Sequence, residues 1–165
     1  MSTALPRARH LAGLAGLLVL SACSTLGPQV SGNGHPPAAA ACVPVADGDP
    51  LVGNWLSVSA QAGVAGALRT LYTLNADGSM AYVEQIKRPR QPSQGLYETG
   101  CWTYQGQTLT LRTQESNGLP VNLDDPIYIN RFRVLRVQPD ALRLQGPQGQ
   151  AIQAKRMSPG YRLPF

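Results

Sequence analysis

Histidine is nearly absent from this sequence, whose 165 residues include only His10 and His35. Both precede Leu51, where a strand-like pattern begins, so the strand-forming part contains no histidine. A Ser-His or Cys-His catalytic arrangement is therefore excluded there by composition. The chain also lacks a Cys-x-x-Cys motif, and no histidine stands near a cysteine at a ligand-like spacing. We therefore expect no redox site, no metal and no cofactor.

Paired acidic residues are also scarce. The only adjacent pair, Asp124-Asp125, precedes a proline in a loop, where such side chains cap turns or face solvent more often than they bind Ca²⁺. Glu84 and Glu98 fall on predicted strands that flank a basic loop, and they are candidate partners for its arginines rather than a hydrolase pair. The sequence therefore predicts a protein that is not an enzyme.

No apolar run is long enough to span a membrane. The run Leu11–Leu20 has about the length of a signal-peptide core. Arg7 and Arg9 precede it without any acidic residue, and two small residues follow it. The quartet Leu20-Ser21-Ala22-Cys23 resembles the lipobox of bacterial lipoproteins.

This resemblance implies that the leader Met1–Ala22 is removed and that Cys23 carries a diacylglyceryl group and an acylated N-terminus, such as a palmitate chain. Two or more acyl chains anchor a protein stably. Ser24 stands where inner-membrane retention usually requires Asp, which favours the outer membrane. We expect the periplasmic face, with exposure at the cell surface as an open alternative. The other reading of the segment is an ordinary secretory leader with a buried or disulfide-bonded cysteine.

The two remaining cysteines are Cys42 and Cys101. In an oxidising compartment they most simply form a disulfide, and two buried thiols are the alternative. The formal net charge of +5 falls to +3 when the leader and its two arginines are removed. So small a surplus does not indicate a nucleic-acid partner.

The chain divides into a leader (1–22), a lipidated end with a flexible Gly-, Pro- and Ala-rich tether (23–50), a domain (51–157) and a tail (158–165). The domain contains no amphipathic helix pattern. It alternates apolar and polar residues between turn signals such as Asn75-Ala76-Asp77-Gly78 and Gln105-Gly106-Gln107. The pattern predicts an all-β fold in which eight strands form an antiparallel up-and-down barrel. The predicted strands are Leu51–Val58, Leu68–Leu74, Ser79–Gln85, Tyr97–Tyr104, Thr108–Thr113, Ile127–Val137, Ala141–Leu144 and Ala151–Arg156.

The order of short motifs along the domain is similar to that of small bacterial lipocalin-like domains. These motifs are Leu51-x-Gly53-x-Trp55, Leu74-x-x-Asp77-Gly78-x-Met80, Gly100-x-Trp102, Gly106-x-x-Leu109-x-Leu111, Phe132-x-Val134-x-x-Val137 and Leu142-x-Leu144. The resemblance implies that Trp55 closes one end of the barrel and that a basic residue of the last strand, Lys155 or Arg156, packs over its ring. The opening motif also resembles that of heat-shock META-type domains, whose Gly-Cys-Asn signature reads Gly100-Cys101-Trp102 here.

A barrel of this size encloses one small ligand or is filled by its own side chains. Alternation predicts that the interior contains Met80, Tyr82, Trp102, Tyr104, Leu109, Leu111, Phe132 and Val134. Of these, Tyr82, Trp102, Tyr104 and Phe132 are the candidate ligand-binding residues.

Two surface features remain. The loop of Lys87, Arg88 and Arg90 could contact phosphate groups or an acidic partner, or simply face solvent. The tail contains Tyr161 and Phe165, which either pack on the barrel or dock to a partner. Two functions therefore fit the sequence: a lipid-anchored protein that binds a small hydrophobic or lipidic molecule, and an accessory subunit of a cell-envelope assembly with a filled barrel.

Overall fold

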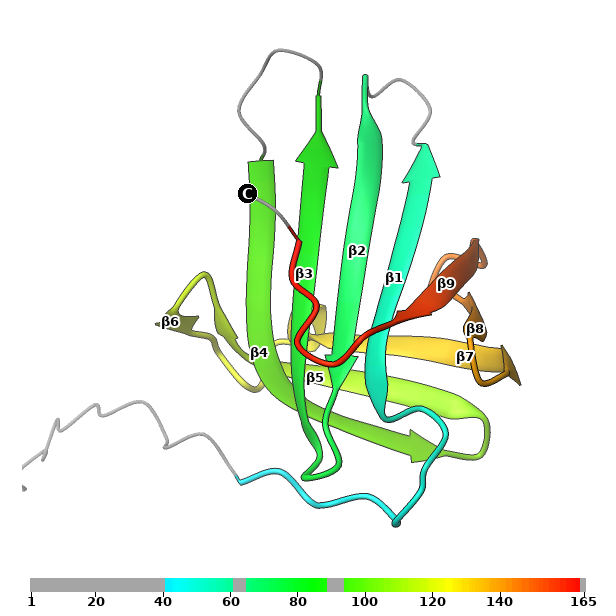
Figure 1. Ribbon diagram of the computed structural model, residues 1–165. Helices are drawn as coiled ribbons and strands as arrows, with labels where there is room; N and C mark the ends of the chain where they lie inside the picture. Colours follow the sequence, from blue (N-terminus) through cyan, green and yellow to red (C-terminus); the bar gives the residue numbers. More distant parts are fainter. Residues whose placement is uncertain (1–40, 61–64, 89–93, 164–165) are drawn as a thin grey trace, which may run out of the picture. The chain divides into compact units, whose positions relative to one another are not determined.

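Nine β-strands and one 3-10 helix make up the part of the chain that the computed structural model describes, residues 41–60, 65–88 and 94–163 (Figure 1). The predicted leader, Cys23, Arg90 and Phe165 lie outside the described residues. The strands are β1 (Gly53–Ala60), β2 (Ala67–Leu74), β3 (Ser79–Lys87), β4 (Gln94–Gln105), β5 (Thr108–Ser116), β6 (Leu119–Pro120), β7 (Ile129–Val137), β8 (Ala141–Gln145) and β9 (Ala151–Met157).

Eight of these strands form a closed antiparallel barrel. The sheet order is β4-β3-β2-β1-β9-β8-β7-β5-β6, and an additional pairing of β4 with β5 closes the ring. Every strand except the short β6 pairs with its neighbours in the manner of an up-and-down barrel, so the predicted all-β architecture is confirmed. In Figure 1, β1 to β4 stand side by side, while β5 and β7 cross behind them.

Glycine permits both the tight turns and the bend of β4. Gly78 has a φ of 80° in the β2–β3 turn, where the Asn75 carbonyl accepts from the Gly78 N–H at 3.0 Å. Gly100 lies at the bulge where β4 passes from β3 to β5, and a Cβ there would collide with the Arg112 carbonyl oxygen. A side chain at Gly100 would therefore separate the strands whose pairing closes the barrel.

The interior is filled at one end. Trp55, Leu74, Met80, Trp102 and Leu142 are all nearly inaccessible and belong to one continuous core. The core also contains Leu51, Tyr72, Leu109, Leu111, Phe132, Val134, Leu144 and Ala154, with Tyr82 and Tyr104 partly buried against it. All eight predicted interior residues are thus in or against the core.

Arg156 contacts several segments at this closed end. Its guanidinium carbon lies 4.0 Å from the centroid of the Trp55 ring. The same group donates to the carbonyls of Val52 and Pro50, each at 2.7 Å, and to that of Pro139 at 2.5 Å. Of the two basic residues that the sequence offered, Arg156 takes this position because its side chain faces inward, while Lys155 is exposed.

The disulfide between Cys42 and Cys101 is present, with 5.3 Å between the Cα atoms. Beyond it, the chain lies against the β2–β3 turn, because the Val45 N–H donates to the Ala76 carbonyl at 2.9 Å. The tether segment after Cys42 is therefore part of the folded unit. It enters at the closed end of the barrel, since the β2–β3, β4–β5 and β7–β8 turns all lie at that end of an up-and-down barrel.

Several predicted boundaries were wrong. The strand predicted to end at Thr113 continues to Ser116 as β5, and the short β6, which was not predicted, pairs with it. The strand predicted from Ile127 begins instead at Ile129, because Pro126–Tyr128 forms a 3-10 turn. Asp125 caps this turn by accepting from the Ile127 N–H at 3.0 Å, which is the capping role expected of the acid pair.

The tail packs on the outer face of the sheet. Leu163 is 3% exposed and lies in a second cluster with Leu71 and Val83, against which Tyr161 also packs. The tail was expected either to pack on the barrel or to dock to a partner, and Tyr161 packs on the barrel.

Candidate functional site

A cavity of about 850 Å³ opens at the end of the barrel opposite the segment that follows Cys42. It exists because β1 and β9 separate: they pair only from Asn54 to Ser57 and from Ala154 to Met157. The end of β1 and the start of β9 therefore diverge, and residues of both line the cavity. Figure 1 shows β9 turning away from β1. The barrel is therefore filled by core side chains at one end and open to solvent at the other.

The wall of the cavity combines aromatic and polar side chains. Tyr72 packs edge-on against Tyr82, with 5.4 Å between ring centroids, and against Phe132 at 5.9 Å. The wall around these rings also includes Ser57, Thr70, Glu84, Asn130 and Ile152. Such a surface suits an amphipathic molecule, because the rings offer apolar contact and the hydroxyl, amide and carboxylate groups offer hydrogen bonds.

Two carboxylates face the interior from adjacent strands. Tyr82 donates its hydroxyl to Glu84 at 3.0 Å, and Thr113 donates to the buried Glu98 at 3.1 Å. Among the described residues, their hydrogen-bond partners are hydroxyl groups and not the arginines that the sequence suggested. The reason is alternation: both glutamates share the inward face of their strands with core residues. Burial raises the pKa of both Tyr72 and Tyr82, so their hydroxyls remain hydrogen-bond donors.

Burial also raises the pKa of the Glu98 carboxyl, and the neighbouring Glu84 adds to the effect. The folded state therefore keeps this proton to a higher pH than the unfolded state, and stability is lost as the pH rises through the folded pKa. We expect Glu98→Gln, which retains an acceptor for Thr113, to raise the melting temperature at about pH 7 and to change it little at about pH 3.5. The exposed Glu115→Gln is the control; equal destabilisation of E98Q at both pH values would contradict this assignment.

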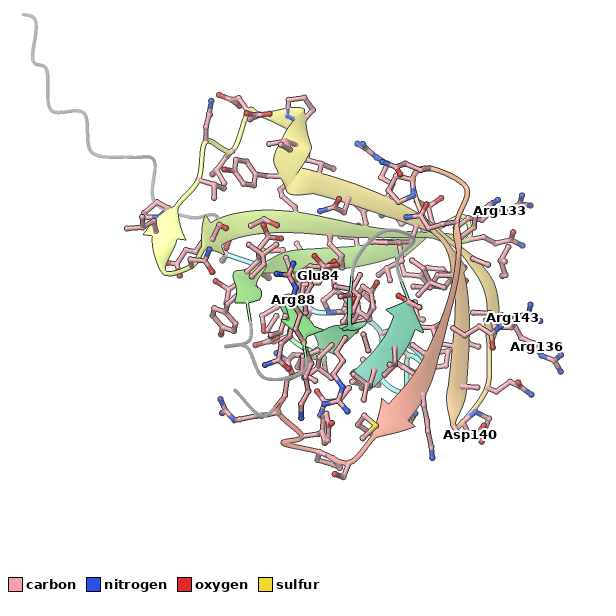
Figure 2. The ribbon with its side chains drawn as sticks, turned by 90° about the horizontal axis from the view of Figure 1, so that it is seen from above. Glu84, Arg88, Arg133, Arg136, Asp140 and Arg143 are labelled. Atoms are coloured by element: carbon pink, nitrogen blue, oxygen red, sulfur yellow. A yellow bond between two sulfur atoms is a disulfide. The ribbon has the colours of Figure 1, made fainter. Side chains whose placement is uncertain are left out.

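The structure describes two residues of the predicted basic loop, the exposed Lys87 and the half-buried Arg88. Lys87 is the last residue of β3, and Arg88 follows it on the inward side. Figure 2 looks down on the ring of strands and shows Arg88 and Glu84 inside it. The Arg88 Nε is buried and has no hydrogen-bond partner in the described part of the chain. The sequence analysis placed Arg88 in a loop and did not predict its inward position. Extending the alternation of Tyr82, Glu84 and Ile86 by two residues would have predicted it.

The four candidate ligand residues separate into two pairs. Tyr82 and Phe132 line the cavity. Trp102 and Tyr104 do not, because β4 bends toward the closed end and places Trp102 beneath the β2–β3 turn, where its Nε1 donates to the Asn75 carbonyl at 2.9 Å. Tyr72 and Glu84 belong to the site in their place, and both could have been found from the period-two pattern of β2 and β3.

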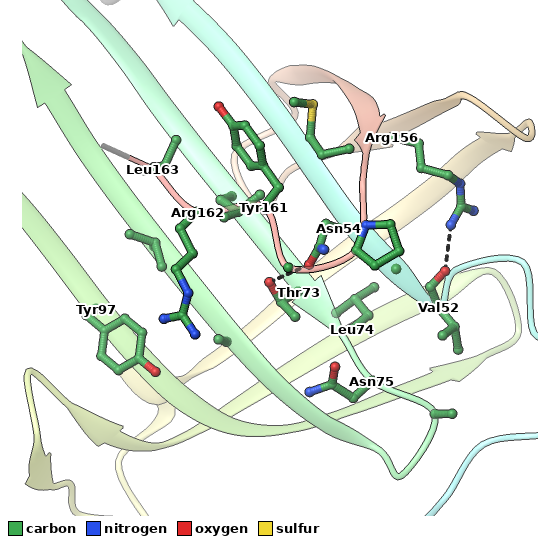
Figure 3. A pocket seen from close by; sticks show the side chains of 18 residues that line it. Val52, Asn54, Thr73, Leu74, Asn75, Tyr97, Arg156, Tyr161, Arg162 and Leu163 are labelled. Atoms are coloured by element: carbon green, nitrogen blue, oxygen red, sulfur yellow. Dashed lines mark hydrogen bonds between the residues drawn. The ribbon is translucent and has the colours of Figure 1, made fainter. Parts of the chain in front are cut away.

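A second hollow, of about 680 Å³, lies on the outside of the sheet beneath the tail (Figure 3). Its floor includes Leu71 and Val83, and Tyr161 and Leu163 cover part of it. Tyr97, which is 46% exposed, forms one border. Most of the surface that lines this groove is apolar, and the groove faces away from the barrel interior.

No described group of three His, Cys, Asp or Glu side chains is placed to hold a metal ion. Among the same residues, no helix combines the length and apolar character needed to cross a membrane. In comparisons with known proteins, no family model matches the chain, and no curated protein matches it significantly in sequence.

Proposed function

We propose that this protein is a membrane-anchored, non-catalytic binding lipoprotein that holds a small hydrophobic or amphipathic molecule in its barrel. The lipobox-like quartet ending at Cys23 supports the anchor, and the predicted address is the periplasmic face of the outer membrane. The observation that carries the binding function is the open cavity, whose wall contains the rings of Tyr72, Tyr82 and Phe132.

A binding assay with the apolar fluorescent probe N-phenyl-1-naphthylamine tests this function. Thr70 is 6% exposed and faces the cavity, so Thr70→Phe places a ring where the ligand would lie. We expect T70F to weaken probe binding at least about tenfold. The matched control is Thr103→Phe, the same substitution at an exposed position of β4, which should leave binding within about twofold. Melting temperatures of both variants show whether the barrel persists; equal probe binding by a folded T70F would refute the proposal.

The second candidate function is that of an accessory subunit in an envelope assembly, and the outer groove favours it. The groove presents Tyr97 and apolar side chains on the face of the sheet away from the cavity. On this interpretation the partner contacts the groove and the tail, and Thr70→Phe leaves assembly unchanged. Probe binding therefore separates the two functions.

A further inference from the structure

The outer face of β7, β8 and β9 is strongly basic. β7 contains three arginines, β8 one, and β9 a lysine and an arginine, while none of the three strands contains an acidic residue. Arg156 is used inside the closed end. The five others are exposed, and we call them the basic face: Arg131, Arg133, Arg136, Arg143 and Lys155.

A β-bulge creates the densest part of this face. In a regular strand Arg136 would point inward with Phe132 and Val134, since residues two apart share a face. The register shifts between Val134 and Arg136, so Leu135 is the extra residue and Arg136 points outward. Figure 2 shows Arg133, Arg136 and Arg143 projecting away from the ring of strands on the same side.

This arrangement costs stability in the isolated protein. Arg136 and Arg143 are direct cross-strand partners, and like charges directly opposite each other destabilise a sheet. Leu135, 51% exposed, adds an apolar side chain between the arginines. A partner that supplies negative charge beside apolar groups would offset both costs. Guanidinium groups, which make up four of the five cations, suit phosphate because they donate two parallel hydrogen bonds to it.

We propose that the basic face docks on the anionic phospholipid headgroups of a membrane surface. Two arguments select a membrane over other polyanions, and the second rests on the proposed lipid anchor at Cys23. Arg136 and Arg143 flank the β7–β8 turn, at the same end of the barrel where the segment after Cys42 enters. The predicted tether of 19 residues between Cys23 and Val43 would hold that end within roughly 25 Å of the anchor. The cavity mouth is at the opposite end from Arg136 and Arg143, so docking through these two residues leaves it open.

Vesicle co-sedimentation tests the docking without the lipid anchor. The chain of residues 24–165 retains the whole described barrel and its disulfide, and it lacks Cys23. We expect it to bind vesicles that contain phosphatidylglycerol and not vesicles of phosphatidylcholine alone. Binding should be lost in about 0.5 M salt, where charges are screened beyond about 4 Å.

Two double variants locate the surface. Arg136→Gln with Arg143→Gln should weaken vesicle binding about 25-fold, at about fivefold for each charge removed. Arg69→Gln with Arg162→Gln removes two cations from other parts of the surface and should change binding by less than about threefold. Arg131→Gln with Arg133→Gln serves as a second test of the face if the first variant does not fold.

Equal losses in the matched variants would overturn the proposal, as would the absence of binding to phosphatidylglycerol vesicles at low salt. Tighter binding to single-stranded DNA than to these vesicles would assign the face to another polyanion and would also overturn it. Because the assay needs neither Cys23 nor a cavity ligand, its failure would leave the proposed binding function standing.

Discussion

We expect replacement of Cys42 and Cys101 together by serine to lower the free energy of unfolding by about 4 kcal/mol. The disulfide joins residues 59 apart, and a cross-link of that span removes much conformational freedom from the unfolded chain. Because a domain is stable by only about 5–15 kcal/mol, the loss should lower the melting temperature by about 15 °C. Denaturant unfolding of the variant and the wild type measures the difference.

Reduction of the wild-type disulfide is the control, because it removes the cross-link without changing a side chain. The reduced wild type and the double variant should unfold at the same denaturant concentration. The barrel should persist in both, since neither cysteine belongs to its apolar core. A difference below about 1 kcal/mol would mean that the contacts after Cys42, such as Val45 with Ala76, already hold this segment without the bond.

The second large effect concerns the anchor. We expect Cys23→Ala to abolish incorporation of labelled palmitate and to prevent normal removal of the leader. The expectation rests on chemistry: only a thiol at this position is nucleophilic enough to accept the lipid. The effect is all or none, because no other residue of the predicted mature N-terminus can take the diacylglyceryl group.

The matched control is the Cys42→Ala, Cys101→Ala double variant, which removes the other two cysteines. It should incorporate palmitate as the wild type does and remain with membranes after a high-salt wash. If C23A were labelled and processed like the wild type, the lipobox interpretation would be wrong. A labelled C23A that lost label in the C42A, C101A background would place the lipid on another cysteine.

Much of the fold could be predicted from local patterns. Alternation of apolar and polar residues placed all eight barrel strands and every interior residue that was named, because one face of each strand must be buried. Turn residues with positive φ marked the β2–β3 and β4–β5 turns correctly. The missed elements were those with weak local signals: β6 is two residues long and ends in a proline, and the turn at Pro126 interrupts a strand-like run.

The candidate site was less predictable, because it depends on contacts between distant segments. No local sequence pattern indicates that β1 and β9 pair over only four residues, yet this short pairing creates the cavity. The bend of β4 likewise moved Trp102 and Tyr104 away from Tyr82 and Phe132. The bulge at Leu135 reversed the direction of Arg136, which strict alternation would have buried. Glu84 and Glu98 accept hydrogen bonds from hydroxyl groups inside the barrel, and their alternation with other inward residues was visible in the sequence.

Native mass spectrometry of the protein extracted from its own membrane in mild detergent shows whether the barrel holds a ligand. We expect the native mass to exceed the mass of the denatured, lipidated chain by one small molecule, and we expect T70F to lose this excess while T103F keeps it. Equal native and denatured masses in the wild type, or an excess that survives in T70F, would contradict a ligand in the barrel.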